Sequence, residues 1–267
     1  MVLTKKDLKF LEDKSFELIK KADRMILEGF QKDKTIKNKD IRDISTNIDV
    51  SVEEFLKDKL KELLPEAGFI IEEGKSTPSN EYNWVIDPID GTKYYSGKVP
   101  MVITQIGLLY KNKSILGLCS NPFTGDIFSA SLGNNTKINK KIVKLDMKKT
   151  PNESIVDCDF GGLDQNIDSK IELFRYLVNN FYRVRITAGF LHPYLITGAI
   201  DVIVTYLKDR TQKKEKFTID YSPRFILYEE LGFVKKDFIF KNLPIMVISS
   251  KDLMNSFVKN YEQFKPI

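Results

Sequence analysis

Two carboxylates stand three residues apart where an apolar segment ends. The nonapeptide from Trp84 to Thr92 reads WVIDPIDGT and carries these acids at Asp87 and Asp90. The apolar residues predict a buried strand, and the proline and glycine that follow predict a turn. Carboxylate oxygens bind hard divalent cations, and Mg²⁺ commonly shares such ligands with a substrate phosphate. Because backbone N–H groups in a tight turn bind anions, the nonapeptide predicts a site for divalent cations and a phosphate.

The segment from Asp87 to Thr92 resembles the signature of the inositol monophosphatase superfamily, a group of metal-dependent, lithium-sensitive phosphatases. An Asp-Gly dipeptide alone would indicate an ordinary turn. Five other segments follow the family order, with similarity to its Asp-x-x-Thr-x-x-Asp, Glu-Glu, Arg-x-Thr-Gly-Ser, Gly-x-x-Asp and Trp-Asp-x-Ala-Ala-Gly elements. They are, in that order, Asp43 to Asp49, Ile70 to Gly74, Arg185 to Gly189, Gly198 to Asp201, and Thr218 to Asp220.

The resemblance implies an α+β fold, a layered α-β-α-β-α sandwich of the inositol monophosphatase or sugar phosphatase type. Residues 1–267 would form a single domain, with an N-terminal α+β half of about residues 1–150 and a C-terminal α/β half of about 151–267. Periodicity by itself indicates mixed helices and strands.

Apolar spacing predicts helices over 4–30, 167–179, 192–197 and 221–231, one ending before Pro65, and one starting at 251. Thr4 with Asp7, and Ser51 with Glu54, predict capping boxes for the first two helices. The Lys-rich stretch 31–43 lacks periodicity and predicts a loop. Strands are predicted over 69–71, 84–86, 101–110, 114–120, 127–131, 155–158, 184–186, 202–205 and 245–248.

The resemblance also implies a set of metal ligands. Glu72 and Asp87 would bind one Mg²⁺ together with the backbone carbonyl of Ile89. Asp87, Asp90 and Asp220 would bind a second ion, and Glu72 would help to hold a third, weaker one. We therefore expect two or three Mg²⁺ per site, with Mn²⁺ as a substitute and Ca²⁺ and Li⁺ as inhibitors. Such ions neutralise phosphate oxygens, activate water and stabilise the leaving alkoxide.

Catalytic and substrate-binding roles follow from the same resemblance. Glu72 would orient the nucleophilic water, and Thr92, paired with Asp49, would position or deprotonate it. Asp49 could alternatively do no more than cap the helix that starts near Ser51. Glu73 is interpreted as a solvated or supporting acid. The predicted substrate-binding residues are Asp90, Gly91, Thr92, Ala188, Gly189 and Asp220, with the N–H groups of Gly91 and Thr92 on the phosphate.

Asp220 matches its motif weakly. Ile219 stands for the expected Trp, and Tyr221-Ser222-Pro223 for the expected Ala-Ala-Gly. A proline is compatible with the first turn of a helix, so we expect Asp220 at a helix start. The weak match leaves open a catalytically weak protein that binds phosphorylated metabolites.

The overall prediction is a Mg²⁺-dependent phosphomonoesterase that hydrolyses a small phosphorylated alcohol. The sequence Asp-Gly-Thr-Lys, which ends at Lys93, resembles the 3′(2′),5′-bisphosphate nucleotidase branch. The histidinol-phosphate and fructose-1,6-bisphosphatase branches also fit the core motif. The Lys-rich segment 208–216 could receive a second anionic group, bind acidic partners as part of a scaffold, or form a solvated loop. Fold resemblance does not choose among these specificities.

Composition narrows the remaining classes. The net charge is +5 with 30% charged residues of mixed sign, and no basic cluster carries interleaved aromatics, so we expect no nucleic-acid partner. No segment resembles a signal peptide or a membrane span. Cys119 and Cys158 are expected as buried free thiols, and His192 as a helix-start or packing residue. We expect a cytoplasmic protein, and the resemblance implies a homodimer.

Overall fold

The computed structural model describes residues 2–32, 34–39, 44–160, 166–187, 189–207, 214–259 and 264–267. They fall into two compact units. Unit 1 comprises Met1–Val143 with Lys213–Glu230, and unit 2 comprises Lys144–Gln212 with Leu231–Ile267. The first boundary lies near the predicted division at residue 150, and a later segment returns to the first unit. A single domain over 1–267 stays a prediction.

Unit 1 is built on a seven-stranded sheet in the order β3-β4-β5-β6-β7-β8-β9. Strands β3 and β4 are parallel, and the remaining neighbours are antiparallel. A separate two-stranded sheet pairs β1 (Ile36–Asn38) with β2 (Ile44–Thr46). The seven strands are β3 (Gly68–Ile71), β4 (Tyr82–Asp90), β5 (Ile103–Tyr110), β6 (Lys113–Asn121), β7 (Asp126–Ser131), β8 (Lys137–Ile138) and β9 (Lys141–Ile142).

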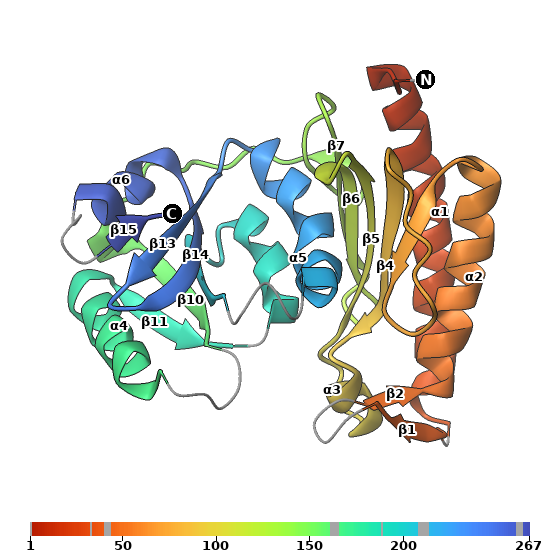
Figure 1. Cartoon of the computed structure of the whole chain (residues 1–267), viewed down its shortest axis with the longest axis horizontal. Coiled ribbons are helices and arrows are strands. Elements are labelled where there is room, and N and C mark those ends of the chain that lie inside the picture. The colour runs from red at the N-terminus through yellow and green to blue at the C-terminus, as the bar shows by residue number, and fades with distance from the viewer. Residues whose placement is uncertain are drawn as a thin grey trace. The chain divides into compact units, whose positions relative to one another are not determined.

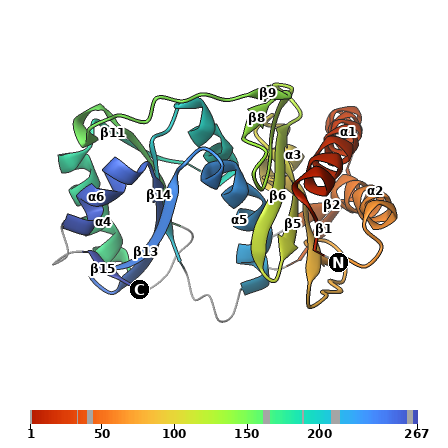
Figure 2. The ribbon, with the colours of Figure 1, turned by 90° about the horizontal axis from the view of Figure 1, so that it is seen from above.

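Helices cover both faces of this sheet. Figures 1 and 2 show α1 (Lys5–Phe30) and α2 (Asn47–Leu63) on one face and α5 (Lys214–Glu229) on the other. Because side chains alternate along a strand, Trp84 and Ile86 enter the core shared with α1 and α2, whereas Val85 packs with Ile219 of α5. Asp87 has the same parity as Val85, so the motif carboxylate belongs to the α5 side.

Helix α5 lies unusually close to the sheet. Two glycines that are paired across β5 and β6, Gly107 and Gly117, face Pro223 of α5. A Cβ atom at Gly117 would lie 1.8 Å from the carbonyl oxygen of Pro223, and one at Gly107 would lie 3.2 Å from its Cα. The absence of side chains at these two positions therefore lets the helix carry Asp220 toward the strand ends.

The cap of α1 was predicted correctly, and the cap of α2 was not. Thr4 and Asp7 form the expected capping box of α1. Helix α2 begins at Asn47, with Thr46 and Asp49 as its capping box, so the predicted pair Ser51 and Glu54 is wrong. The Ser51 hydroxyl instead donates to the carbonyl of Asn47 inside the first turn. The helix ends at Leu63, as the following proline predicts.

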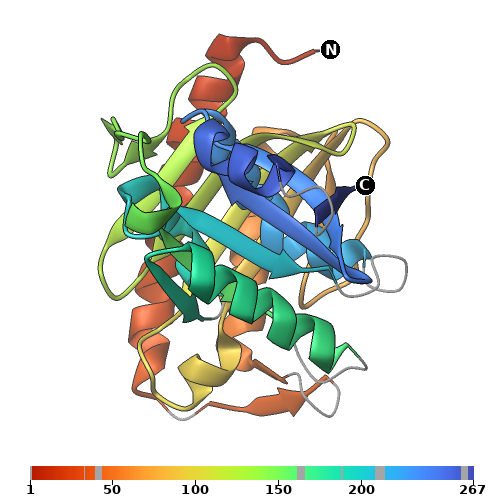
Figure 3. The ribbon, with the colours of Figure 1, turned by 90° about the vertical axis from the view of Figure 1, so that its left-hand side faces the viewer.

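Unit 2 has a mixed six-stranded sheet in the order β11-β10-β12-β14-β13-β15. Helices α4 (Ile167–Asn180) and α6 (Lys251–Lys259) pack their apolar residues into one core on this sheet, and Figure 3 shows both on its near face. The strands are β10 (Ile155–Asp159), β11 (Arg183–Ile186), β12 (Val202–Tyr206), β13 (Val234–Phe240), β14 (Leu243–Ser249) and β15 (Phe264–Pro266).

Some predicted boundaries need correction. Residues 189–197, with Pro193 inside, form a 3₁₀ helix, so the helix predicted over 192–197 begins three residues earlier. Helix α5 begins at Lys214 instead of 221, and the predicted loop 31–43 contains β1. Strands β13 and β15 were not predicted. The short pieces are α3 (Thr92–Ser96) and a 3₁₀ turn at Pro151–Glu153.

The α+β class is confirmed, with α-β-α layering inside unit 1. Both cysteines are free and buried, as expected. Among the described residues, no helix is long and apolar enough to cross a membrane.

Candidate active site

The end of strand β4 presents the two motif carboxylates. Asp87 pairs in register with Gln105 of β5, whereas Asp90 pairs with Ile103, so β4 carries one extra residue between them. Such a bulge re-aims side chains at the end of a strand. The Thr104 hydroxyl donates to the carbonyl of Pro88 at 2.9 Å and holds the bulge in place. Because of this register shift, the side chains of Asp87 and Asp90 point in different directions from the end of β4.

Gly91 makes the turn that follows. Its φ is +106°, a conformation that side-chain-bearing residues rarely adopt, and it precedes the short helix α3. The Tyr95 hydroxyl fixes this helix by donating to the carbonyl of Ile26 in α1 at 2.7 Å. The backbone N–H groups at the start of the turn are thus held on a rigid support beside Asp90.

Thr92 and Asp49 are joined by a hydrogen bond, as the resemblance implies. The Thr92 hydroxyl lies 3.0 Å from Asp49 Oδ1 and 3.0 Å from the carbonyl oxygen of Ile89. Asp49 also accepts from the backbone N–H and the hydroxyl of Thr46, so it both caps α2 and orients Thr92. Burial raises the pKa of Asp49, and the hydrogen bonds from Thr46 and Thr92 partly offset that rise. The two interpretations of Asp49 are therefore compatible.

Glu72 follows strand β3, and a buried acid of α2 fixes its loop. Glu53 accepts hydrogen bonds from the backbone N–H groups of Glu73 and Gly74, each at 2.7 Å. Lys39 contacts both neighbouring acids, at 3.2 Å from Glu72 and 2.6 Å from Glu73. The Glu73 side chain is only 3% exposed, and burial raises its pKa to about 7. Of the two interpretations of Glu73, the solvated acid is wrong and the supporting acid is confirmed, because Glu73 pairs with Lys39.

Asp87 is a buried carboxylate with three acids around it. Burial, then the charges of Glu72, Asp90 and Asp220, raise its pKa well above the usual value. Its Oδ2 accepts from the Gln105 side-chain amide at 3.2 Å, whereas its Oδ1 has no hydrogen-bond partner among the described residues. A buried carboxylate oxygen facing other acids needs a cation or a proton.

Asp220 is in the second turn of α5 rather than at the helix start. The prediction failed because Pro223, taken as a first-turn residue, lies inside the helix. Burial, then the charge of Asp90, raise the pKa of Asp220 to about 7, and Lys216 and Arg224 lower it. Aligned residue by residue, the family's Ala-Ala-Gly falls on Ser222, Pro223 and Arg224, one position later than predicted.

Arg224 is a site residue that the sequence analysis missed. Its side chain is 1% exposed, and its guanidinium forms an ion pair with Asp90. Its Nε also donates to Gln105 Oε1 at 2.7 Å. The sequence held one signal, because Arg224 follows Asp220 by four residues and so shares its helix face. Gln105, Glu53 and Lys39 gave no such signal.

The donor set fits a hard cation at one position. Glu72 and Asp87 offer carboxylate oxygens. A positive charge would stabilise Asp87 Oδ1, which has no hydrogen-bond partner among the described residues. Mg²⁺ is commonly held by one or two carboxylates, with water and substrate phosphate as the remaining ligands. Within the described part of the chain, no three Asp, Glu, His or Cys side chains converge tightly enough to hold a metal. The ligand set of Asp87, Asp90 and Asp220 therefore stays a prediction.

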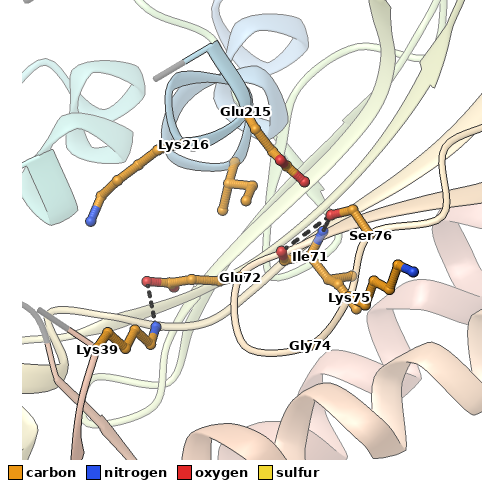
Figure 4. Close-up of a pocket in the computed structure, with 9 residues that line it drawn as sticks. Lys39, Ile71, Glu72, Gly74, Lys75, Ser76, Glu215 and Lys216 are labelled. Carbon is orange, nitrogen blue, oxygen red and sulfur yellow. Dashed lines mark hydrogen bonds and ion pairs between the residues drawn. The ribbon is translucent and has the colours of Figure 1, made fainter. Parts of the chain in front are cut away.

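A pocket of about 440 Å³ opens beside Glu72 within unit 1. Figure 4 shows the Lys39–Glu72 ion pair on one side and Glu215 of α5 near Ser76 on the other. This pocket gives a small molecule access to the Glu72 carboxylate. Its lining residues are Lys39, Ile71, Glu72, Gly74, Lys75, Ser76, Glu215, Lys216 and Ile219.

The remaining predicted residues belong to unit 2 or lie outside the described residues. Ala188, Asp43 and most of the Lys-rich segment 208–216 are outside them, and Gly189 starts the 3₁₀ helix. The Thr187 hydroxyl donates to the buried carboxylate of Asp157, which lies 3.5 Å from His192 Nε2.

Asp201 has a structural role in unit 2. It accepts from Lys149 at 2.7 Å and from the backbone N–H of Ile155 at 2.9 Å. These contacts hold the start of β10.

Solved structures resemble this chain over most of its length. SuhB from Bartonella henselae gives a TM-score of 0.77 at 16% identity, covering 90% of this chain and 93% of that one. An inositol monophosphatase from Anabaena gives 0.74 at 20% identity, covering 94% and 96%. These similarities establish the fold.

Curated relatives match a shorter segment. Inositol monophosphatase 2 of Solanum lycopersicum is 30% identical over 155 residues, covering 56% of this chain and 58% of that protein. Nus factor SuhB of Haemophilus influenzae is 26% identical over 145 residues, covering 53% and 54%. The chain thus spans about half the length of the curated relatives it matches. The profile of the inositol monophosphatase family matches residues 7–215. The motif residues, the fold and this match together show that the chain belongs to the inositol monophosphatase family.

Proposed function

We propose that this protein is a phosphomonoesterase that cleaves a small phosphorylated alcohol with the help of Mg²⁺. The observation that carries the proposal is the buried Asp87, whose Oδ1 lacks a partner among the described residues while three other acids raise its pKa. This arrangement does not serve the stability of the fold, because a buried charge that faces like charges destabilises it. A bound cation removes that cost.

The chain's own residues suit the other requirements of ester hydrolysis. Thr92, with its hydroxyl oriented by Asp49, can hold a water molecule next to Asp90. The N–H groups of the Gly91 turn can donate to a phosphate oxygen, since successive backbone N–H groups in a tight turn bind anions. Glu72, fixed by the Glu53-bonded loop, borders the pocket from which a substrate enters. Mg²⁺, when bound, would supply neutralisation of the phosphate charge and activation of the water.

A panel of phosphate esters tests this proposal. Phosphate release would be measured with Mg²⁺ and with a chelator for inositol 1-phosphate, adenosine 3′,5′-bisphosphate, fructose 1,6-bisphosphate and histidinol phosphate. The proposal predicts release that depends on Mg²⁺ and favours one ester. No release from any ester under either condition would contradict it and would favour a protein that binds phosphorylated metabolites without turnover.

A further inference from the structure

Arg224 is a buried cation at the carboxylate cluster of unit 1. Its side chain is 1% exposed, and its guanidinium pairs with Asp90. Burying a guanidinium is costly unless it is paired and hydrogen-bonded. Burial lowers its pKa, but the charge of Asp90 and smaller contributions from Tyr228, Cys119 and Tyr221 together outweigh burial and raise the pKa, so the group stays charged. A permanent positive charge is therefore built into the site.

The same side chain reaches a second acid through Gln105. Arg224 Nε donates to Gln105 Oε1 at 2.7 Å, and Gln105 Nε2 donates to Asp87 Oδ2 at 3.2 Å. Gln105 is fully buried and stands between Asp87 of β4 and Cys119 of β6 in one row of the sheet. Arg224 thus neutralises Asp90 directly and holds one oxygen of Asp87 through the amide.

Asp220 is also within reach of this charge. Arg224 follows it by four residues on the same face of α5, so the guanidinium interacts with the Asp220 carboxylate through its charge. The three acids that would jointly bind a second metal ion, Asp87, Asp90 and Asp220, therefore all interact with Arg224. A divalent cation placed among them would meet a fixed positive charge at short range, which Coulomb's law disfavours.

The position between Glu72 and Asp87 differs. Asp87 Oδ1 has no partner in the described part of the chain, and Glu72 is the acid whose charge acts most strongly on Asp87. The side chain of Glu72 is 18% exposed, so water can complete the coordination of an ion there. The side chain of Lys39, which is paired with Glu72, is 22% exposed, so water can solvate its ammonium when an ion binds Glu72.

From these contacts we propose that Arg224 takes the place of one divalent cation. The site binds a single Mg²⁺ or Mn²⁺ between Glu72 and Asp87, and the guanidinium supplies the second positive charge at Asp90. This inference rests on the proposed function in one respect, because it assigns the same carboxylates to cation binding. Arg224 would act as a positioning residue that sets how many ions the site accepts.

The test counts bound Mn²⁺ by electron paramagnetic resonance and calorimetry on the full chain. The wild type should bind one Mn²⁺ per chain with the spectrum of an isolated ion. Arg224→Met keeps the length of the side chain and removes the charge, so it should bind a second ion at least tenfold more tightly than the wild type does. Arg224→Lys keeps a charge and should remain at one ion.

Several results would overturn the inference. These are two or more Mn²⁺ on the wild type, no Mn²⁺ on it, or one ion on both the wild type and Arg224→Met. Should Arg224→Met fail to fold, the wild-type spectrum decides. Two ions in a binuclear site lie about 4 Å apart and couple magnetically, so a coupled spectrum contradicts the inference and an isolated one supports it.

Phosphate release on the same samples separates this inference from the proposed function. If the wild type binds two ions and releases phosphate, the role of Arg224 is overturned and the proposed phosphatase activity stands. One bound ion without turnover of any ester would overturn the proposed phosphatase activity and leave the ion count standing.

Discussion

The Thr92 hydroxyl lies 3.0 Å from a carboxylate oxygen of Asp49, a residue 43 positions earlier in the chain. Asp49 is held by the capping box of α2, so the start of one helix fixes the direction of a hydroxyl at the end of strand β4. The cap is therefore part of the candidate active site.

Removing the Thr92 hydroxyl tests this arrangement. Thr92→Val should lower kcat by about 10²- to 10⁴-fold, the range for losing a group that handles a proton or positions water. The buried Asp49 loses one hydrogen bond, so the free energy of unfolding should fall by about 1 kcal/mol. Thr92→Ser keeps the hydroxyl and is the matched control. Equal rates for Thr92→Val and Thr92→Ser would show that the hydroxyl takes no part.

Asp23 should make stability depend on pH. It is buried in α1 and accepts from the Ser120 hydroxyl at 2.7 Å, and burial raises its pKa to about 7. The folded state therefore keeps a proton that the unfolded chain releases near pH 4, so this contribution to stability falls as pH rises from about 4 to 7. Asp23→Asn should stabilise the protein at pH 8 by an amount on the order of 1–4 kcal/mol and much less at pH 4.

Urea unfolding at the two pH values measures this difference. Asp13→Asn on the exposed side of the same helix is the control and should change little. A loss of stability by Asp23→Asn that is equal at both pH values would refute the assignment.

Breaking a buried ion pair should cost far more stability than breaking an exposed one on the same helix. Glu12 accepts from Lys137 at 2.8 Å and from the hydroxyls of Ser129 and Ser131, and it is 1% exposed. Glu12→Ala leaves the Lys137 ammonium buried without this partner and should cost about 3–5 kcal/mol of unfolding free energy. The exposed pair of Glu17 with Lys140 offers the comparison, and Glu17→Ala should cost less than about 1 kcal/mol. Similar losses for both variants would be inconsistent with this structure.

The close approach of α5 predicts unequal effects at two neighbouring glycines. Gly117→Ala places a Cβ atom 1.8 Å from the carbonyl oxygen of Pro223, so the helix must move. At Gly107 the nearest atoms of Pro223 are 3.2 Å away, and a small shift suffices. Overpacking typically costs about 1–3 kcal/mol, and we expect Gly117→Ala to exceed that range and Gly107→Ala to stay within it. Thermal unfolding of the two variants would show the order, and the reverse order would contradict this packing.

Sequence reasoning succeeded where a residue's position is set by its near neighbours in the chain. Asp87, Asp90, Gly91 and Thr92 are adjacent in the chain, so the motif places them at a strand end whatever the rest of the fold does. The α1 cap was likewise predicted from two residues three positions apart, Thr4 and Asp7.

It failed where a partner is distant. Arg224 is tied to Gln105 and Asp90, which lie 119 and 134 positions away. An arginine in a helix is usually solvated, and no local pattern shows that this one is covered by β5. The start of α5 was misplaced for a related reason. Pro223 resembles a first-turn proline, and only its packing against Gly107 and Gly117 of the sheet explains its position inside the helix.

The most direct test of the central claim compares the wild type with Asp87→Asn. Asp87 is the buried acid that the cation is proposed to relieve, so the substitution should abolish Mg²⁺-dependent phosphate release, with a fall of at least about 10²-fold. Because it removes a buried charge repelled by its neighbours, the variant should unfold at a temperature no lower than the wild type. An Asp87→Asn protein that releases phosphate at the wild-type rate would contradict the account.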